Sequence, residues 1–311
     1  MKYLYLFALV ALHPLTWAAQ PSAPRALGAH PVVTLTFDDL PAAGSLPPNT
    51  DRTQILTKLA DELRSNRLEG TYGFVNAVDL TGDADAQNAL HIWLNSGMNI
   101  GNHTWSHVLL TESTVKAFEE EIAKDEPALE SFAQVRDWRW FRYPALLEGE
   151  SIYKRRAVLR YLAGHGYRVA RVTLDFQDDE WNDPYARCVA QNDTAAIQWL
   201  KQSYMESAVE YIRAGREEQL IVFGHEIPNV LLLHATAFTT LMLPDLMTLL
   251  RREGFVFDGL AHVASDPIYT RELNAAFADD GTLTNLFMDA KNLKYPPVKP
   301  IPEERLKTIC Q

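Results

Sequence analysis

Two adjacent carboxylates end the most strand-like run in the chain. Residues 32–37 read Val-Val-Thr-Leu-Thr-Phe, the apolar and β-branched composition of a buried parallel strand, and Asp38 and Asp39 follow directly. An unpaired carboxylate costs several kcal/mol to bury in an apolar interior. We therefore expect Asp38 and Asp39 at the edge of a sheet, where they would face a cation or a substrate.

Two histidines four residues apart offer metal-binding chemistry. In His103-Thr-Trp-Ser-His107, one helical turn would place both imidazoles on the same face, able to bind one metal ion. Two histidines and one carboxylate with an open position are the ligands of a catalytic zinc or a similar divalent ion. Taken alone, the spacing fits two unrelated helix histidines equally well.

The elements that must position these residues alternate between strand-like and helical patterns. The strand-like segments are 32–39, 70–75, 98–101, 138–142, 167–174, 230–233 and 255–257. The helical segments are 52–66, 84–96, 113–132, 152–163, 193–223 and 243–252. Because no internal linker divides them, we predict one α/β domain, an irregular (β/α) barrel of about seven parallel strands.

Three more polar residues lie at or after the ends of later strand-like segments. They are Arg142, Asp178 and His234. A barrel places its active residues at the C-terminal ends of its strands, so these three would join the acids and the histidines. The alternatives are a surface ion pair for Arg142, a solvated acidic loop for Asp178, and a buried core histidine for His234.

Composition limits the classes of partner. The chain has 311 residues, of which 47% are hydrophobic, and its formal net charge of −11 argues against non-specific binding of nucleic acid or anionic lipid. A neutral or cationic substrate is easier to accommodate. Cys188 and Cys310 could form one disulfide or remain two free thiols, and the sequence does not indicate an oligomeric state.

The N-terminus has the three regions of a secretory signal peptide. Lys2 precedes an apolar run too short to span a membrane, and small residues follow at Ala18 and Ala19. We predict a signal peptide at 1–19, with a buried N-terminal element as the alternative, and a periplasmic or secreted protein with no membrane span after cleavage. The remaining segments are a flexible arm at 20–31, the barrel at 32–270 and a C-terminal extension packed on it at 271–311.

Four ordered motifs resemble those of the polysaccharide deacetylases, also called carbohydrate esterase family four or the NodB-homology family. They are Thr36-Phe-Asp-Asp39, His103-Thr-Trp-Ser-His107, Phe141-Arg-Tyr-Pro144 and Leu231-Leu-Leu-His234. The resemblance covers about residues 32–257. It departs at Leu40, where the family usually has glycine, and at Asp179, where the family has a tryptophan.

The resemblance implies a role for each matching residue. Asp38 would be the general base, oriented by Arg142, and His234 the general acid, supported by Asp178. One divalent metal ion, most simply zinc, would be held by Asp39, His103 and His107. The residues expected to contact substrate are Tyr143, Pro144, Ala145, Trp181 and Leu233.

The activity implied is the release of acetate from an N-acetylated poly- or oligosaccharide, such as peptidoglycan or a chitin-like glycan. An O-acetyl esterase acting on a xylan-like glycan is a close variant, because the same metal and base can cleave an ester. Hydrolysis of a small cyclic amide is a second alternative. A glycan-binding module without turnover is the non-enzymatic alternative.

Overall fold

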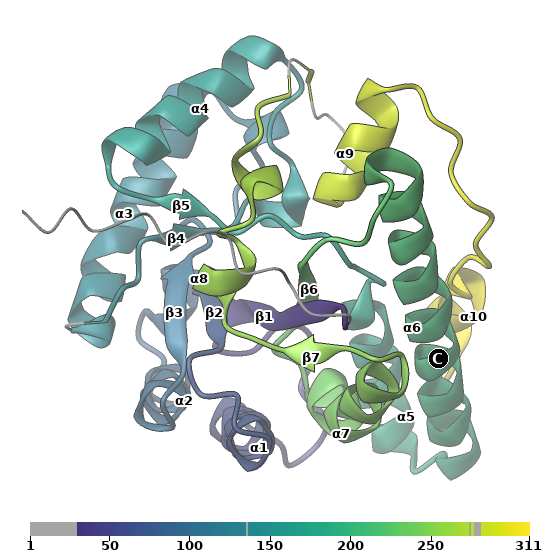
Figure 1. Cartoon of the computed structure of the whole chain (residues 1–311). Helices are drawn as coiled ribbons and strands as arrows, with labels where there is room; N and C mark the ends of the chain where they lie inside the picture. Colours follow the sequence, from purple (N-terminus) through teal and green to yellow (C-terminus); the bar gives the residue numbers. More distant parts are fainter. Residues whose placement is uncertain (1–29, 135, 274, 277–280) are drawn as a thin grey trace, which may run out of the picture.

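Seven parallel strands form one sheet at the centre of the molecule, in a computed structural model that describes residues 30–134, 136–273, 275–276 and 281–311 (Figure 1). The spatial order is β5-β4-β3-β2-β1-β6, and β7 pairs with the beginning of β1. The strands are β1 (Val32–Leu40), β2 (Tyr72–Val75), β3 (Asn99–Asn102), β4 (Trp140–Phe141), β5 (Arg168–Val169), β6 (Asn229–His234) and β7 (Val256–Phe257).

The sheet curves back on itself. After the short strand β5, the chain returns to the other end of the sheet, where Leu174 forms a parallel bridge to Leu231 of β6. β4 and β5 have only two residues each, so this side of the curved sheet is poorly regular. The predicted irregular (β/α) barrel of about seven parallel strands is therefore confirmed.

Helices cover the outside of the sheet (Figure 1). The α-helices are α1 (Arg52–Ser65), α2 (Ala84–Asn95), α3 (Val115–Ala133), α4 (Ile152–Gly164), α5 (Asn182–Gln191), α6 (Thr194–Phe223), α7 (Ala237–Arg252), α8 (Leu260–Val263), α9 (Leu283–Ala290) and α10 (Glu303–Thr308). Short 3₁₀ turns are η1 (Ala77–Leu80), η2 (Leu110–Glu112), η3 (Pro144–Leu146), η4 (Asp178–Trp181) and η5 (Pro267–Thr270). The sequence analysis did not predict α5, α8, α9 or α10.

The central strand β1 is buried along most of its length. Residues 33 to 38 are all buried, so Thr34, Thr36 and Asp38 are enclosed together with the apolar residues that alternate with them, as in a strand covered on both faces. Phe37 packs edge to face against Trp93 of α2, with 5.9 Å between ring centroids. This packing fixes the strand whose end carries the two acids.

The C-terminal extension contacts the barrel helices. Its helix α9 packs against α6, and α10 contacts η4. A disulfide joins Cys188 of α5 to Cys310, and Arg187 donates to the backbone carbonyl of Leu306 at 2.8 Å. The alternative of two free thiols is therefore wrong.

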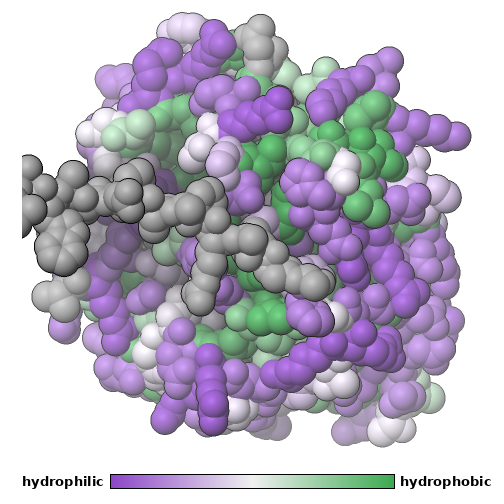
Figure 2. Space-filling view, in the orientation of Figure 1, coloured by the Kyte–Doolittle hydropathy of each residue, from purple (hydrophilic) through white to green (hydrophobic). Residues whose placement is uncertain are grey.

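The molecular surface in Figure 2 is mainly hydrophilic, with scattered apolar patches. Two of the most exposed large apolar residues are Tyr153 and Leu220. Among the residues that the structure describes, no helix combines the length and the apolar character needed to cross a membrane. The predicted signal peptide, and the predicted arm up to residue 29, lie outside the described residues.

Candidate active site

Asp38 and Asp39 reach the same pocket because the backbone changes direction between them. Successive side chains of a regular strand point to opposite faces. Here Asp39 has a φ of +59°, and the pairing of β1 with β2 shifts register between Phe37 and Leu40. The irregularity turns Asp39 toward the side on which Asp38 already lies.

His103 and His107 lie on a loop after β3, not on a helix, so the predicted helical turn is wrong. The segment has positive φ angles at Thr104 and His107, which a right-handed helix does not permit. The fold nevertheless brings the imidazoles together, with 5.0 Å between ring centroids. Asp39 Oδ1 lies 3.5 Å from His103 Nε2 and 3.7 Å from His107 Nε2.

The tautomer of His103 suits a metal ligand. Its Nδ1 lies 2.9 Å from the carbonyl oxygen of Arg142, an acceptor, so Nδ1 carries the proton and donates it. Nε2 is therefore left with a free lone pair on the side facing Asp39. Burial lowers the pKa of His103 to about 3, which keeps the ring neutral and able to coordinate.

Asp39, His103 and His107 fit a divalent metal ion. Their candidate ligand atoms all lie within 4.8 Å of one another. Asp39 Oδ1 is buried without a hydrogen-bond partner in the described structure, and such an atom is rarely left unpaired. One carboxylate and two imidazoles match the donor set of zinc and related ions.

A second group of possible ligands has a different explanation. The side chains of Asp178, Asp179 and His234 also lie close together. Both oxygens of Asp178 already accept hydrogen bonds, Oδ1 from His234 Nδ1 at 2.8 Å and Oδ2 from Thr239 Oγ1 at 2.5 Å. Protein donors therefore satisfy Asp178 without an ion.

Arg142 does not line the pocket, but its buried guanidinium hydrogen-bonds to Asp38. Its Nη1 donates to the Asp38 carboxylate at 3.1 Å, Nη2 to Thr36 Oγ1 at 2.9 Å, and Nε to the carbonyl oxygen of Ala170 at 2.6 Å. Burial raises the pKa of Asp38 above its ordinary value, and Arg142 opposes this effect. This contact would suit the expected role of Arg142 in orienting Asp38. The pKa of Asp38 nevertheless stays above its ordinary value, because the effect of burial exceeds the effect of the guanidinium.

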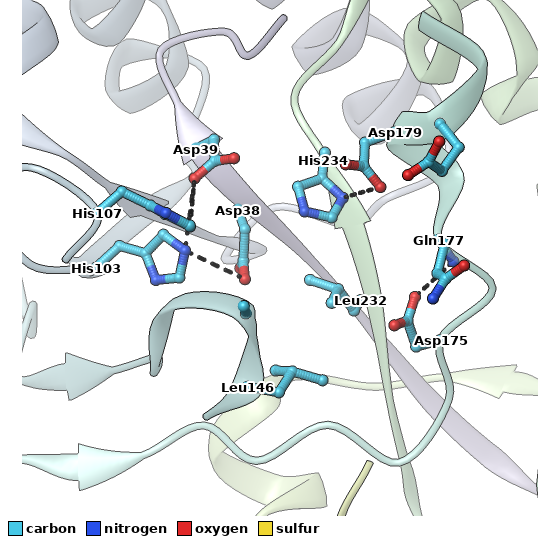
Figure 3. Close-up of a pocket in the computed structure, with 12 residues that line it drawn as sticks. Asp38, Asp39, His103, His107, Leu146, Asp175, Gln177, Asp179, Leu232 and His234 are labelled. Atoms are coloured by element: carbon cyan, nitrogen blue, oxygen red, sulfur yellow. Dashed lines mark hydrogen bonds and ion pairs between the residues drawn. The ribbon is translucent and has the colours of Figure 1, made fainter. Parts of the chain in front are cut away.

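His234 is the cationic group next to Asp38, and it lies across the pocket from His103 and His107 (Figure 3). Burial alone would lower its pKa, but Asp179 and Asp178 raise it well above the ordinary value. Asp178 accepts the Nδ1 proton, so the other ring nitrogen, Nε2, is not engaged by that carboxylate. The imidazolium therefore has a proton available to donate at neutral pH.

These groups surround one pocket of about 240 Å³ (Figure 3). In Figure 3, Asp39, His103 and His107 lie on one side of the pocket with Asp38 beside them, and His234, Asp175, Gln177 and Asp179 lie on the other. The lining residues that the sequence analysis predicted are Asp38, Asp39, His103, His107, Ala145 and His234. Those that it did not assign to the site are Leu146, Asp175, Gln177, Asp179, Glu180 and Leu232.

Two of the predicted substrate contacts are corrected by the structure. Leu233 is fully buried away from the pocket, and Leu232 lines it instead, because residues two apart on a strand share a face and His234 sets that face. Counting back by two from His234 would have found Leu232. Trp181 is also fully buried, and its Nε1 donates to Ser203 Oγ at 2.8 Å.

The two residues that follow Arg142 are also buried. Tyr143 is 2% exposed and stacks on Phe118, while Pro144 is buried at the start of η3. Only Ala145 of this predicted group lines the pocket, together with Leu146. Both have positive φ angles.

Comparisons with known proteins point to one family. The polysaccharide deacetylase family model matches residues 28–170. A search of the curated proteins found no match.

Three solved structures resemble the fold. A mutant of BA3943, described as a CE4 family pseudoenzyme with restored enzymatic activity, is 17% identical over 76% of this chain and 68% of its own, with a TM-score of 0.53. Wild-type BA3943 from Bacillus anthracis, a CE4 family pseudoenzyme, is 15% identical over 76% and 66%, with a TM-score of 0.52. The chitin deacetylase of the fungal pathogen Colletotrichum lindemuthianum is 17% identical over 76% and 88%, with a TM-score of 0.50. At these identities the three establish the fold alone.

Proposed function

We propose that the chain, whose residues 28–170 match the polysaccharide deacetylase family model, removes N-acetyl groups from the amino sugars of a peptidoglycan- or chitin-like glycan. One observation carries the proposal. A carboxylate, Asp38, and an imidazolium, His234, flank the same pocket as a complete Asp-His-His metal set. Because a pseudoenzyme shares this fold, the fold alone does not imply catalysis, and we infer turnover from these residues instead.

The metal site belongs to this proposal. Asp39, His103 and His107 would hold one divalent ion, most simply zinc. When bound, the ion would polarise the acetyl carbonyl and make a water molecule more acidic. The neutral state of His103 and the unpartnered oxygen of Asp39 support this assignment.

Asp38 would act as the general base. It would accept a proton from the attacking water while that water's oxygen forms a bond to the acetyl carbon. A buried carboxylate with a raised pKa is a stronger proton acceptor than one in water. Arg142 Nη1 orients this carboxylate, and the bonds from Nε to Ala170 and from Nη2 to Thr36 hold the guanidinium itself. Ala145 would contribute its backbone N–H to the negative charge that develops on the carbonyl oxygen.

His234 would complete the reaction as the general acid. As the bond between the acetyl carbon and the amide nitrogen breaks, the imidazolium gives its Nε2 proton to that nitrogen. The products are acetate and the free amine of the sugar. Asp178 supports this role through its contact with Nδ1, which holds the ring in one orientation.

Export is the second part of the proposal. Residues 1–19 would be removed as a signal peptide, leaving the arm at 20–31, the barrel at 32–270 and the extension at 271–311 to act in the periplasm or outside the cell. N-terminal sequencing of the secreted protein would test this. A first residue near Ala19 or Gln20 is expected, and material that begins at Met1 would overturn it.

Acetate release tests the catalytic part. The mature protein would be stripped of metal, reloaded with zinc and assayed on N-acetylglucosamine oligomers, peptidoglycan fragments and acetylated xylan, with His103→Ala as the control. We expect zinc-dependent release from one of the two N-acetylated substrates, abolished in the control. Release from xylan alone would favour the O-acetyl esterase, and one equivalent of bound zinc without acetate would favour the cyclic amides.

A further inference from the structure

The two histidines of the proposed metal site are held in different ways. His103 is 1% exposed, and its Nδ1 donates to the carbonyl of Arg142 in the core. His107 has a side chain that is 42% exposed. Its position therefore depends mainly on the backbone of the loop 103–107 that carries it.

That loop needs support from outside its own sequence. Thr104 and His107 both adopt positive φ, a region that non-glycine residues occupy only when their surroundings hold them there. The first half of the loop is held by Asn76, whose Nδ2 donates to the carbonyls of His103 at 2.7 Å and Thr104 at 3.0 Å. The second half leads directly into His107.

One residue of α3 receives the hydrogen bonds of that second half. The carbonyl oxygen of Glu121 accepts from Trp105 N at 3.2 Å. Its Oε2 accepts from both Ser106 N at 2.9 Å and Ser106 Oγ at 2.8 Å. Glu121 thus fixes the two residues immediately before His107, although it does not line the pocket itself.

We propose that Glu121 is a positioning residue for the metal site, which acts by holding the Trp105–Ser106 backbone so that the His107 imidazole meets Asp39 and His103. This inference rests on the proposed function, because it requires that these three residues bind a metal ion. Groups that hydrogen-bond directly to metal ligands commonly change metal affinity by about 10- to 100-fold when they are lost. Glu121 lies one step further out, because it bonds to Trp105 and Ser106 rather than to His107, so we expect its loss to act near the lower end of that range.

Metal affinity provides a readout that does not depend on turnover. Zinc binding would be measured by competition with a chromophoric chelator, and the ligand geometry by the visible absorption of the cobalt-substituted protein. We expect Glu121→Ala to weaken zinc binding by about tenfold or more and to alter the cobalt bands. Glu121→Gln keeps an acceptor oxygen and should remain close to the parent in both measurements.

Matched variants separate positioning from general damage. Glu120→Ala, an exposed neighbour on the same helix, should bind zinc as the parent does. Ser106→Ala loses one of the two bonds to Oε2 and should weaken zinc binding less than Glu121→Ala, so it carries the test if Glu121→Ala does not fold. Parent-like zinc affinity and cobalt bands in both Glu121→Ala and Ser106→Ala would overturn the inference while leaving the proposed function intact. A parent that binds no zinc or cobalt would overturn the proposed metal site itself.

Discussion

Asp38 and His234 are register partners on the adjacent parallel strands β1 and β6. Partners in a parallel register point to the same side of the sheet, so the carboxylate and the imidazole enter the pocket next to each other. A guanidinium flanks Asp38, whereas the carboxylates of Asp178 and Asp179 flank His234. Arg142 opposes the rise that burial causes in the pKa of Asp38, whereas Asp179 and Asp178 raise the pKa of His234 well above its ordinary value.

Replacement of the proposed base should stop turnover without removing the metal. We expect Asp38→Asn to lower kcat by about 10²- to 10⁴-fold, because the amide cannot accept the proton of the attacking water. Steady-state acetate release would measure this, and a zinc titration of the same variant should still give one equivalent. Normal turnover by Asp38→Asn would show that another group is the base.

The pH profile should depend on the acids beside His234. Those acids raise the pKa of His234, so its proton is present at low and neutral pH and is lost as the pH rises through the folded value. Asp179 Oδ1 lies 3.6 Å from Nδ1, and Asp179→Asn removes its charge. We expect the alkaline limb of kcat/KM to move to lower pH, and an unmoved limb would exclude His234 as the acid that controls it.

The sequence predicts which strands bring the site residues together, but it does not predict the local backbone conformation at Asp39 or in the loop at 103–107. The apolar run of β1 and the order of the motifs are enough to bring Asp38, Arg142 and His234 to one end of the sheet, because parallel strands align their C-terminal ends. The positive φ of Asp39 has no local signal, since it follows from the register shift against β2. The loop at 103–107 is held by tertiary hydrogen bonds from Asn76 and to Glu121 of α3, which the spacing of the two histidines does not reveal.

The substrate-side residues were predicted less well for a related reason. Motif membership does not state which way a side chain points. Trp181 satisfies its indole N–H inside the core, and the segment before it presents Asp175, Gln177 and Asp179 to the pocket instead. The wall opposite the candidate metal site is therefore acidic, where the sequence predicted the indole of Trp181.

Metal removal should lower thermal stability through the same three ligands. A ligand that binds only the folded state stabilises it by about 2.7 kcal/mol when present at 100 times its Kd. We expect zinc to raise the Tm of the chelator-treated parent and to have little effect on Asp39→Asn, measured by differential scanning fluorimetry. An equal zinc-induced shift in both proteins would mean that zinc binds elsewhere.

Glu148 should stabilise the barrel through two buried arginines. It accepts from Arg155 Nε at 2.9 Å and from Arg171 Nε at 2.7 Å, and all three side chains are buried. Glu148→Gln would remove the buried anion that the two guanidiniums share, while Arg155 keeps its ion pair with Glu272, and we expect the free energy of unfolding to fall by about 3–5 kcal/mol. Urea denaturation would measure the loss, and Glu150→Gln at an exposed site should change little.

The same ion cluster should make stability sensitive to acid. Burial alone would raise the pKa of Glu148, but Arg171 and Arg155 hold it below its ordinary value of 4.5. The stabilisation by the ionised carboxylate is therefore present above 4.5 and is lost as the pH falls through the folded value. The difference in the free energy of unfolding between the parent and Glu148→Gln should therefore shrink as the pH falls below 4.5. A difference that stays constant would show that ionised Glu148 is not the source of the stabilisation.

Glu218 should make stability depend on pH in the opposite sense to Glu148, because folding raises its pKa instead of lowering it. It is 8% exposed on α6 and accepts from Asn285 Nδ2 of α9 at 2.8 Å, and burial raises its pKa to about 7. Since the folded state binds this proton more tightly, the stabilisation is present below about 4.5 and is lost as the pH rises through 7. Glu218→Gln keeps the acceptor without the charge, so its Tm should exceed that of the parent at pH 8 by more than at pH 5. If the Tm of Glu218→Gln differs from that of the parent by the same amount at pH 5 and pH 8, folding does not raise the pKa of Glu218.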